Sequence, residues 1–397
     1  MMQSVVISAL HVDDNEVEVV ERKGLGHPDT ICDALAEALS RNLCCEYRKR
    51  FGTILHHNVD KALLRGGRAA PAFGGGVVLT PIGIYLAGRA VTEVGGETLP
   101  IDEIAIEGSK SWIRANLHAL DANHHVNIHN LVRPGSQDLL DLFSRRSRSD
   151  ALLANDTSVG LGYAPMSALE HLVLAVEKRI NSGNRSHRAW GEDVKIMGIR
   201  CGSTVRLTVA CAMIGQYLSH IDDYLGEKAA VENLAHALAI EHGFPQCSVY
   251  INMADDPPKG AIYLTVTGTS AEAGDDGQVG RGNRINGLIT PYRPMTLEAV
   301  AGKNPVTHVG KIYNVLAREI AETLVAEEPD IIAAQCLLVG QIGAPIKEPA
   351  LLHIKLSTRD ETPVAQFKSR AEDIARAHLA RTSELVDGFI AGTIDLF

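Results

Sequence analysis

The 397-residue chain lacks several features that would place it in common protein classes. No apolar run is long enough to span a membrane, and residues 1–10 lack the basic and apolar regions of a secretory signal, so we expect a cytoplasmic protein with no membrane partner. The seven cysteines are odd in number and contain no C-x-x-C pair, which favours reduced core residues over zinc ligands or disulfides. The formal net charge is −10 with scattered Lys and Arg, which argues against a nucleic-acid partner.

The chain also lacks the common nucleotide-binding loops. A dinucleotide-binding fingerprint needs a third glycine where Asp29 stands, and a carboxylate there would repel a pyrophosphate. The pair Gly302-Lys303 is not a Walker A loop, because Leu297 replaces the leading glycine and Asn304 replaces the Ser or Thr. In the presence of Mg²⁺, however, Asp29 becomes a suitable oxygen ligand that brings the metal to phosphate oxygens.

The segment GLGHPDTICD at residues 24–33 lies between a predicted strand and a predicted helix. Valines and glutamates at 16–21 predict the strand, and an apolar residue at every fourth position from Ile31 predicts a helix to about residue 50. His27 and Asp29 would therefore lie at the electropositive helix N-terminus, where anions bind. The structural alternative is a tight glycine turn in which Asp29 is only a helix cap.

A second segment, residues 274–311, interleaves glycines with basic side chains. Glycines allow backbone N–H groups to line a concavity for anions, and Arg and Lys add charge and hydrogen-bond donors, so a polyphosphate suits this segment. The alternative is a long solvated loop. The basic residues are Arg281, Arg284, Arg293, Lys303, His308 and Lys311.

Carboxylates elsewhere are weaker candidates when taken alone. Asp193 and Lys195 lie two residues apart on one face of a predicted strand and can share a ligand, although such pairs are more often exposed surface pairs. Asp275 and Asp276, beside glycines, could hold a metal or an ammonium group. Asp138 and Asp156 lie in polar turns that could equally be helix caps or Asx turns.

Strand-like and helix-like segments alternate throughout, which predicts an α/β (α+β) protein. Ser167-x-x-Glu170 is a capping box that opens a helical stripe. Further helices are expected at 227–242, 312–324 and 370–392, and strands at 53–57, 77–86, 194–200, 204–214, 248–253, 261–267 and 350–356. We divide the chain approximately into 1–150, 151–270 and 271–397, and expect the true subdomains to interleave.

The chain resembles the S-adenosylmethionine synthetase (methionine adenosyltransferase) family, and specifically its archaeal-type branch. The resemblance runs from end to end, with several long motifs in the family's order. These motifs are GLGHPDTICDALAEALSR, HHNVDKALLRGG, RPGSQDLLDLF, ANDTSVGLGYAPMS, GEDVKIMG, LTVTGTSAEAGDDGQVGRGNRINGLITPYRPM and GKNPVTHVGKIYN.

The resemblance implies a two-step reaction. The sulfur of L-methionine attacks C5′ of ATP and displaces the triphosphate, which is cleaved to pyrophosphate and phosphate with water. His27 would contact the leaving oxygen, Asp29 would bind Mg²⁺, and Asp193 would orient nearby cations. The phosphates would be held by Lys195, Arg281, Lys303 and His308. The ATP and methionine pocket would include Asp275 for the methionine ammonium, Gly135, Ser136, Gln137, Asp138, Leu139, Leu140, Asp156 and, as weaker candidates, Asp60 and Lys61.

The resemblance further implies three similar subdomains around a pseudo-threefold axis, built from discontinuous segments. It also implies a homodimer in which residues of both subunits complete each active site. Three positions depart from the bacterial and eukaryotic branch, which carries Lys, Lys and Asp where this chain has Thr30, Gly282 and Gly310. The missing charges would be supplied elsewhere, with Arg284 and Lys311 as candidates, and the number of metals and any K⁺ requirement do not transfer.

Three alternatives remain at this stage. A relative with altered pockets would use another thioether or nucleotide. A nucleotide-binding regulator would keep the fold without turnover, which the intact His27, Asp29 and Lys303 argue against. A Rossmann oxidoreductase would need the third glycine that Asp29 replaces.

Overall fold

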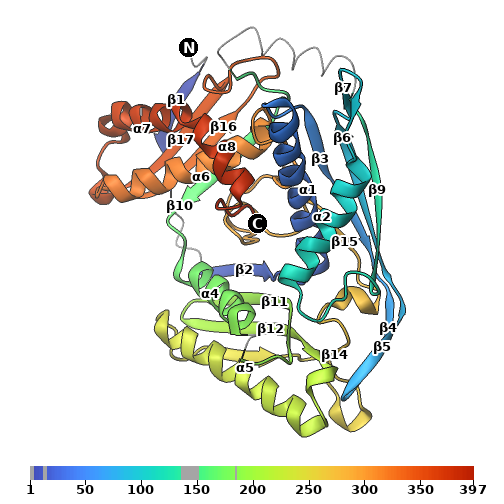
Figure 1. Cartoon of the computed structure of the whole chain (residues 1–397). Coiled ribbons are helices and arrows are strands. Elements are labelled where there is room, and N and C mark those ends of the chain that lie inside the picture. Colours follow the sequence, from blue (N-terminus) through green and yellow to red (C-terminus); the bar gives the residue numbers. More distant parts are fainter. Residues whose placement is uncertain (1–3, 12–15, 136–151, 184–185) are drawn as a thin grey trace.

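Three mixed α/β units surround a common centre in the computed structural model, which describes residues 4–11, 16–135, 152–183 and 186–397 (Figure 1). Each unit is a sheet with helices packed on it, and each has its own hydrophobic core. We call the three sheets A, B and C. The α/β (α+β) class expected from the sequence is confirmed.

Sheet A joins segments from both ends of the chain. Its strand order is β1 (Val5–Ala9), β17 (Leu351–Thr358), β16 (Ile331–Val339) and β10 (Val159–Ala164). The pair β1·β17 is parallel, whereas the other two pairs are antiparallel. Helix α6 (Val309–Glu327) packs on β10 and β16, and α7 (Lys368–Ala380) packs on α6, followed by α8 (Thr382–Ala391).

Sheet B has the order β13 (Ser248–Ile251), β12 (Thr204–Ile214), β11 (Trp190–Cys201) and β2 (Val17–Lys23), and β14 (Leu264–Thr265) also pairs with β12. Helices α4 (Ala168–Gly183) and α5 (Ile221–Glu241) cover it. The predicted capping box opens α4: the Ser167 hydroxyl accepts the Glu170 N–H at 3.0 Å, and the Glu170 carboxylate accepts the Ser167 N–H at 2.7 Å.

Sheet C has the order β15 (Gly277–Gln278), β3 (His57–Arg65), β6 (Ile82–Ala90) and β9 (Val126–Pro134). Helices α1 (Pro28–Phe51) and α2 (Ile101–Asn116) cover one face. Two short hairpins complete the structure: β4 (Arg68–Ala72) with β5 (Gly75–Thr80), and β7 (Glu93–Val94) with β8 (Glu97–Thr98). None of the described helices is long and apolar enough to cross a membrane.

Four predicted elements are corrected by the structure. Of the strand predicted at 261–267, only β14 (Leu264–Thr265) forms. The strand predicted at 53–57 is wrong, because α1 continues to Phe51, a left-handed Gly52 ends it, and β3 begins only at His57. The strand predicted at 77–86 is two strands that meet at Pro81, which cannot donate a ladder hydrogen bond. The helix predicted at 370–392 is two helices, α7 and α8.

The sheets combine segments that are distant in sequence. Sheet A takes strands from all three of the ranges 1–150, 151–270 and 271–397, and sheets B and C each take strands from two of them. The ranges themselves stay a prediction. The consequence for function is that β2, α1 and β15, which belong to different sheets or ends of the chain, meet in one place (Figure 1).

Candidate functional site

The glycines of GLGHPD attach the start of α1 to sheet B. Beyond the end of β2, the chain continues to pair with β11, because Gly24 N–H donates to the Val194 carbonyl at 2.6 Å and Gly26 N–H donates to the Glu192 carbonyl at 2.8 Å. A Cβ at Gly26 would lie 2.5 Å from the backbone nitrogen of Asp193, so only glycine allows this approach. His27 is thereby fixed beside the strand that carries Asp193 and Lys195.

His27 is the N-cap of α1, and this role sets its tautomer. Its backbone is extended (φ −66°, ψ 138°), and its Nδ1 accepts the N–H of Asp29 at 3.1 Å. Burial lowers the pKa of His27 to about 4, against the opposing attraction of Asp29, so the ring is neutral near pH 7. Because Nδ1 is an acceptor, the single ring proton is on Nε2, and His27 offers an uncharged N–H donor.

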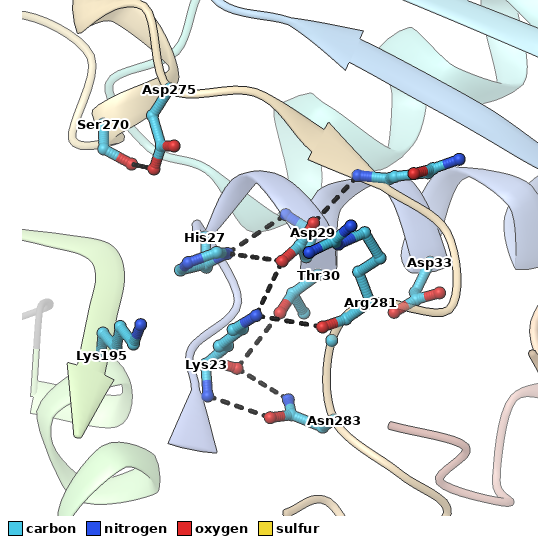
Figure 2. Close-up of polar contacts among 12 residues, drawn as sticks. Lys23, His27, Asp29, Thr30, Asp33, Lys195, Ser270, Asp275, Arg281 and Asn283 are labelled. Atoms are coloured by element: carbon cyan, nitrogen blue, oxygen red, sulfur yellow. Dashed lines mark hydrogen bonds and ion pairs between the residues drawn. The ribbon is translucent and has the colours of Figure 1, made fainter. Parts of the chain in front are cut away.

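Asp29 lies in the first turn of α1 and is held from two sides (Figure 2). Its Oδ2 accepts a hydrogen bond from the Lys23 ammonium at 2.8 Å, and its Oδ1 accepts the N–H of Gln278 in β15 at 2.9 Å. The carboxylate is buried, yet each oxygen keeps a further lone pair. Asp29 therefore connects β2, α1 and β15 at the point where their ends meet.

A second carboxylate lies one helical turn further along α1. The Oδ1 of Asp33 accepts the Gly280 N–H at 2.9 Å, whereas its buried Oδ2 has no hydrogen-bond partner among the described atoms. Burial raises the pKa of Asp33 to about 7, although the Gly280 N–H opposes the rise. The spacing of four residues puts Asp33 and Asp29 on the same face of α1.

These carboxylates fit a magnesium ion that is bound mainly through the phosphates of a substrate. Mg²⁺ usually keeps several waters and takes one or two protein carboxylates together with substrate phosphates. Asp29 supplies such a carboxylate, and the unpartnered oxygen of Asp33 lies on the same face of α1. Among the described residues, no group of three or more His, Cys, Asp or Glu side chains forms a closed metal cage.

Asp193 contacts the loop that carries Asp275. Its buried Oδ2 accepts the N–H of Ser270 at 2.7 Å, and the Ser270 hydroxyl donates to Oδ2 of Asp275 at 3.0 Å. Burial raises the pKa of Asp193 to about 6, although Ser270 opposes the rise. In the described contacts, Asp193 thus orients a backbone amide next to Asp275, whereas we predicted that it would orient cations.

Lys195 and Arg281 lie at the margin of the same region. The Lys195 ammonium is 3.5 Å from Oε1 of Glu21, and 44% of its side chain is exposed. Arg281 is exposed, and its carbonyl accepts a hydrogen bond from Lys23 at 3.0 Å. Both cations are therefore accessible to an anion that approaches His27 (Figure 2). We call His27, Asp29, Lys23, Lys195, Asp193, Asp275 and Arg281 the His27 cluster.

Lys303 is the centre of a second group of candidates. Its buried ammonium is 2.5 Å from Oδ2 of Asp60 and 2.8 Å from Oε1 of Glu298. Burial alone would raise the pKa of Asp60, but Lys303 and Lys61 outweigh burial and lower it to about 2. Lys61, which is largely exposed, contacts the other oxygen of Asp60 at 2.6 Å.

His308 repeats the arrangement of His27 at the start of α6. Its Nδ1 accepts the Gly310 N–H at 3.1 Å, and its Nε2 is 3.4 Å from Oδ2 of Asp156. Burial, aided by the Lys303 charge, lowers the pKa of His308 to about 3, so this ring too is a neutral Nε2–H donor. We call Asp60, Lys61, Lys303, His308, Asp156 and Glu298 the Lys303 cluster.

The two clusters are separate. Among the described residues, no hydrogen bond or ion pair joins a side chain of one cluster to a side chain of the other. The Lys303 carbonyl accepts a hydrogen bond from Ser40, which is roughly 16 Å further along α1 than Asp29 at ~1.5 Å per residue. Each cluster is therefore only part of the predicted site.

The remaining predictions concern the pocket residues 135–140 and two cations. Gly135 follows the end of β9, and Ser136, Gln137, Asp138, Leu139 and Leu140 lie outside the described residues. The two cations suggested as replacements for the missing charges, Arg284 and Lys311, form contacts with other groups. Arg284 donates to backbone carbonyls that include that of Gly282, and the fully buried Lys311 pairs with Glu37 at 2.8 and 2.7 Å.

Sequence reasoning missed Lys23 and Glu298. Lys23 could have been found, since the alternation of β2 puts it on the same face as Glu21 and opposite Lys195 in the sheet register. Glu298 fills the space beside Gly310, where an added Cβ would lie 2.9 Å from its carboxylate. No local pattern indicates that contact, because it depends on how the 274–311 segment folds back.

Comparison with known proteins places the chain in a family. The profile of the S-adenosylmethionine synthetase (AdoMet synthetase) family matches residues 3–393. A probable S-adenosylmethionine synthase of Aquifex aeolicus is 50% identical over 381 residues, covering 94% of each chain. The S-adenosylmethionine synthase of Pyrococcus furiosus is 46% identical, covering 97% of this chain and 96% of that one.

A solved structure agrees with the fold. An unusual S-adenosylmethionine synthetase from Campylobacter jejuni superposes with a TM-score of 0.63 at 14% identity, covering 96% of this chain and 94% of that one. The profile match and the full-length relatives lead to one conclusion. The chain belongs to the S-adenosylmethionine synthetase family.

Proposed function

We infer that the protein is a methionine adenosyltransferase, which forms S-adenosylmethionine from ATP, L-methionine and water and releases pyrophosphate and phosphate. Full-length identity of 44–50% to S-adenosylmethionine synthases supports this assignment. The structural observation that carries it is the neutral Nε2–H of His27 beside Lys23, Lys195 and Asp29. A donor of this kind suits an oxygen that gains negative charge as a bond to it breaks.

The first step needs alignment and charge stabilisation more than proton transfer. Displacement at C5′ breaks the bond to the triphosphate, so negative charge develops on the leaving oxygen. A fixed N–H donor at that oxygen stabilises the charge and lowers the barrier. His27 can supply it without a change of protonation, because its pKa of about 4 keeps the ring neutral. Lys195 and Arg281 would bind the outer phosphates from the exposed side of the cluster.

Asp275 would receive the ammonium group of methionine. It is exposed, and the Ser270 hydroxyl contacts only one of its oxygens, which leaves the other for a ligand. Asp193 supports this arrangement by holding the Ser270 backbone. The methionine sulfur would then be positioned by this pocket relative to His27.

Mg²⁺ is the expected metal, with Asp29 as its ligand. When bound, it would add positive charge at the phosphates. A K⁺ requirement is doubtful. The protein's own residues bind and orient the substrate, and they hold the ring proton of His27 at Nε2.

A homodimer would complete the site by bringing the Lys303 cluster of one copy to the His27 cluster of the other. The uncovered face of sheet C supports this proposal: Leu63 and Leu131 are 48% and 44% exposed there, and they line a hollow of about 370 Å³ with Tyr85 and Ala87. Exposed apolar patches of this kind indicate protein interfaces. We place the dimer in the cytoplasm, in keeping with seven free cysteines.

Complementation tests the shared site. Purified His27→Asn and Lys303→Met proteins are mixed, dissociated and reassociated, so that heterodimers carry one intact site. If the clusters belong to different subunits, the mixture should recover roughly a quarter of wild-type activity, since half of the random dimers are mixed. No recovery, with dimers shown by sedimentation, would mean that each site forms within one chain.

The activity itself is tested with purified protein, ATP, Mg²⁺ and L-methionine, with and without K⁺. S-adenosylmethionine and phosphate are followed together by chromatography. Equal amounts of both products establish the transferase with its coupled triphosphatase. Phosphate without S-adenosylmethionine would indicate a different acceptor, and neither product would indicate a nucleotide-binding protein without turnover.

A further inference from the structure

Lys23, the last residue of β2, lies at the centre of the His27 cluster (Figure 2). Its ammonium donates to Oδ2 of Asp29 at 2.8 Å and to the carbonyl of Arg281 at 3.0 Å. Only 13% of its side chain is exposed. Nothing in the sequence motifs or in the comparisons gives this lysine a role.

The side chain of Asn283 forms hydrogen bonds to both backbone polar groups of Lys23, as the backbone of a neighbouring strand would. The Lys23 N–H donates to Oδ1 of Asn283 at 3.0 Å, and Nδ2 of Asn283 donates to the Lys23 carbonyl at 2.8 Å. The Thr30 hydroxyl donates to the same carbonyl at 3.1 Å. Asn283 is itself buried, so this arrangement fixes the starting point of a long side chain.

The Lys23 ammonium also has a donor left for a ligand. A lysine ammonium has three N–H groups, and two of them are used by Asp29 and Arg281. Oε1 of Glu21 is 3.8 Å away, beyond hydrogen-bond distance, and the same oxygen is 3.5 Å from the Lys195 ammonium. Glu21 therefore keeps the two ammonium groups near each other, on the side where His27 offers its Nε2–H.

We propose that Lys23 is a phosphate-binding residue of this site, with Asn283 and Thr30 as its positioning residues. The proposal rests on the proposed function for the identity of the anion, a triphosphate. A cation that is already fixed before the ligand arrives costs less to order on binding. The competing explanation is that Lys23 only neutralises the buried Asp29.

The test measures binding of inorganic triphosphate by calorimetry in EDTA, so that neither metal nor turnover contributes. Removal of one charge-assisted contact should weaken binding roughly ten- to a hundredfold in Lys23→Met. Lys23→Arg should keep most of the affinity, and Asn283→Ala should lose part of it although Lys23 is intact. Lys259→Met is the matched control, because Lys259 is exposed and its ammonium pairs, among the described residues, only with Asp256.

A double variant separates the two explanations. Asp29→Asn together with Lys23→Met removes both charges, so a lysine that merely neutralised Asp29 would no longer be needed. If Lys23 contacts the triphosphate, the double variant should bind it more weakly than Asp29→Asn alone. Equal affinity of the double variant and Asp29→Asn, or wild-type affinity in Lys23→Met alone, would overturn the proposal. Melting temperatures confirm that each variant is folded.

Failure of this proposal can be told apart from failure of the proposed function. If the wild-type protein forms S-adenosylmethionine but binds triphosphate as tightly after Lys23→Met, the transferase stands and the role of Lys23 is wrong. If Lys23→Met loses triphosphate affinity but the wild-type protein forms no S-adenosylmethionine, Lys23 binds phosphate in a site with another activity. Wild-type protein that forms product without detectable triphosphate binding would also overturn the role of Lys23.

Discussion

Replacement of His27 by asparagine should separate catalysis from stability. In the structure, the Nδ1 of His27 caps α1 by accepting the Asp29 N–H at 3.1 Å, and in the proposed mechanism its Nε2–H donates to the leaving oxygen. Asparagine is among the preferred N-cap residues, so it can keep the cap. Its side chain is too short to place a donor where Nε2 lies.

The expected magnitudes follow from these two roles. Loss of one preorganised donor at a developing oxyanion typically lowers kcat by about 10²–10³. His27→Asn should show that loss with an almost unchanged melting temperature, whereas His27→Ala should show the same loss plus about 1 kcal/mol less stability from the missing cap. Hydrolysis of added triphosphate should fall much less, since the donor acts on the bond to C5′.

Rapid-quench measurement of S-adenosylmethionine formation, beside steady-state hydrolysis of added triphosphate, provides the assay. His220→Asn is a control for the cap, because His220 accepts the Asp223 N–H through Nδ1 at the start of α5 and belongs to neither cluster. Equal losses in both reactions after His27→Asn would refute the assignment of His27 to the leaving oxygen. A normal rate of S-adenosylmethionine formation would refute it as well.

Three further predictions concern other parts of the molecule. Lys311→Met should lower the free energy of unfolding in urea by about 3–5 kcal/mol, because it leaves the buried Glu37 carboxylate without its lysine partner. The double variant Glu37→Gln/Lys311→Met should be more stable than Lys311→Met. Asp275→Asn should raise the KM for methionine at least tenfold with little change in the KM for ATP. Asp276→Asn is the control and should change neither KM, because the Asp276 carboxylate accepts the Gly66 N–H. A higher KM for ATP alone after Asp275→Asn would contradict the ammonium role. Burial lowers the pKa of His57 to about 3, so between about pH 6.5 and pH 3 the unfolded chain binds a proton that the folded chain does not. The contribution of neutral His57 to stability is fully present above pH 6.5 and decreases as the pH is lowered, by about 2 kcal/mol at pH 5. His57→Gln should flatten that part of a plot of melting temperature against pH.

The sequence predicted those elements whose determinants are local. Helix α4 begins where the Ser167 capping box places it, and β12 spans the predicted residues 204–214. Five of the seven cysteines are buried as expected, whereas Cys45 and Cys201 are exposed. Periodicity could not show which strands pair, because pairing such as β1 with β17 depends on the tertiary packing of distant segments.

Which residue types form the candidate site was predictable from the sequence, but most of their contact partners were not. The helix entrance at His27 and Asp29 follows from local signals, since strand alternation, glycines and a following apolar stripe lie within thirty residues. The pairing of Lys303 with Asp60 does not, because it joins residues 243 positions apart, whereas the pairing of Lys23 with Asp29 spans only six positions and was overlooked. Arg284 is taken up by its own loop, because its guanidinium donates to the carbonyls of Gly280 and Gly282.

The parallel pairing of β1 with β17 has a consequence for synthesis of the chain. Val5 pairs with Leu352, so the first strand must wait until roughly 340 further residues have been made before its partner exists. At ~5–20 residues per second this delay is roughly 20–70 s, during which sheet A cannot close on the ribosome. Sheets B and C can form earlier, and sheet A, with the most distant contacts, should be the last to fold and the most prone to aggregate when translation stalls.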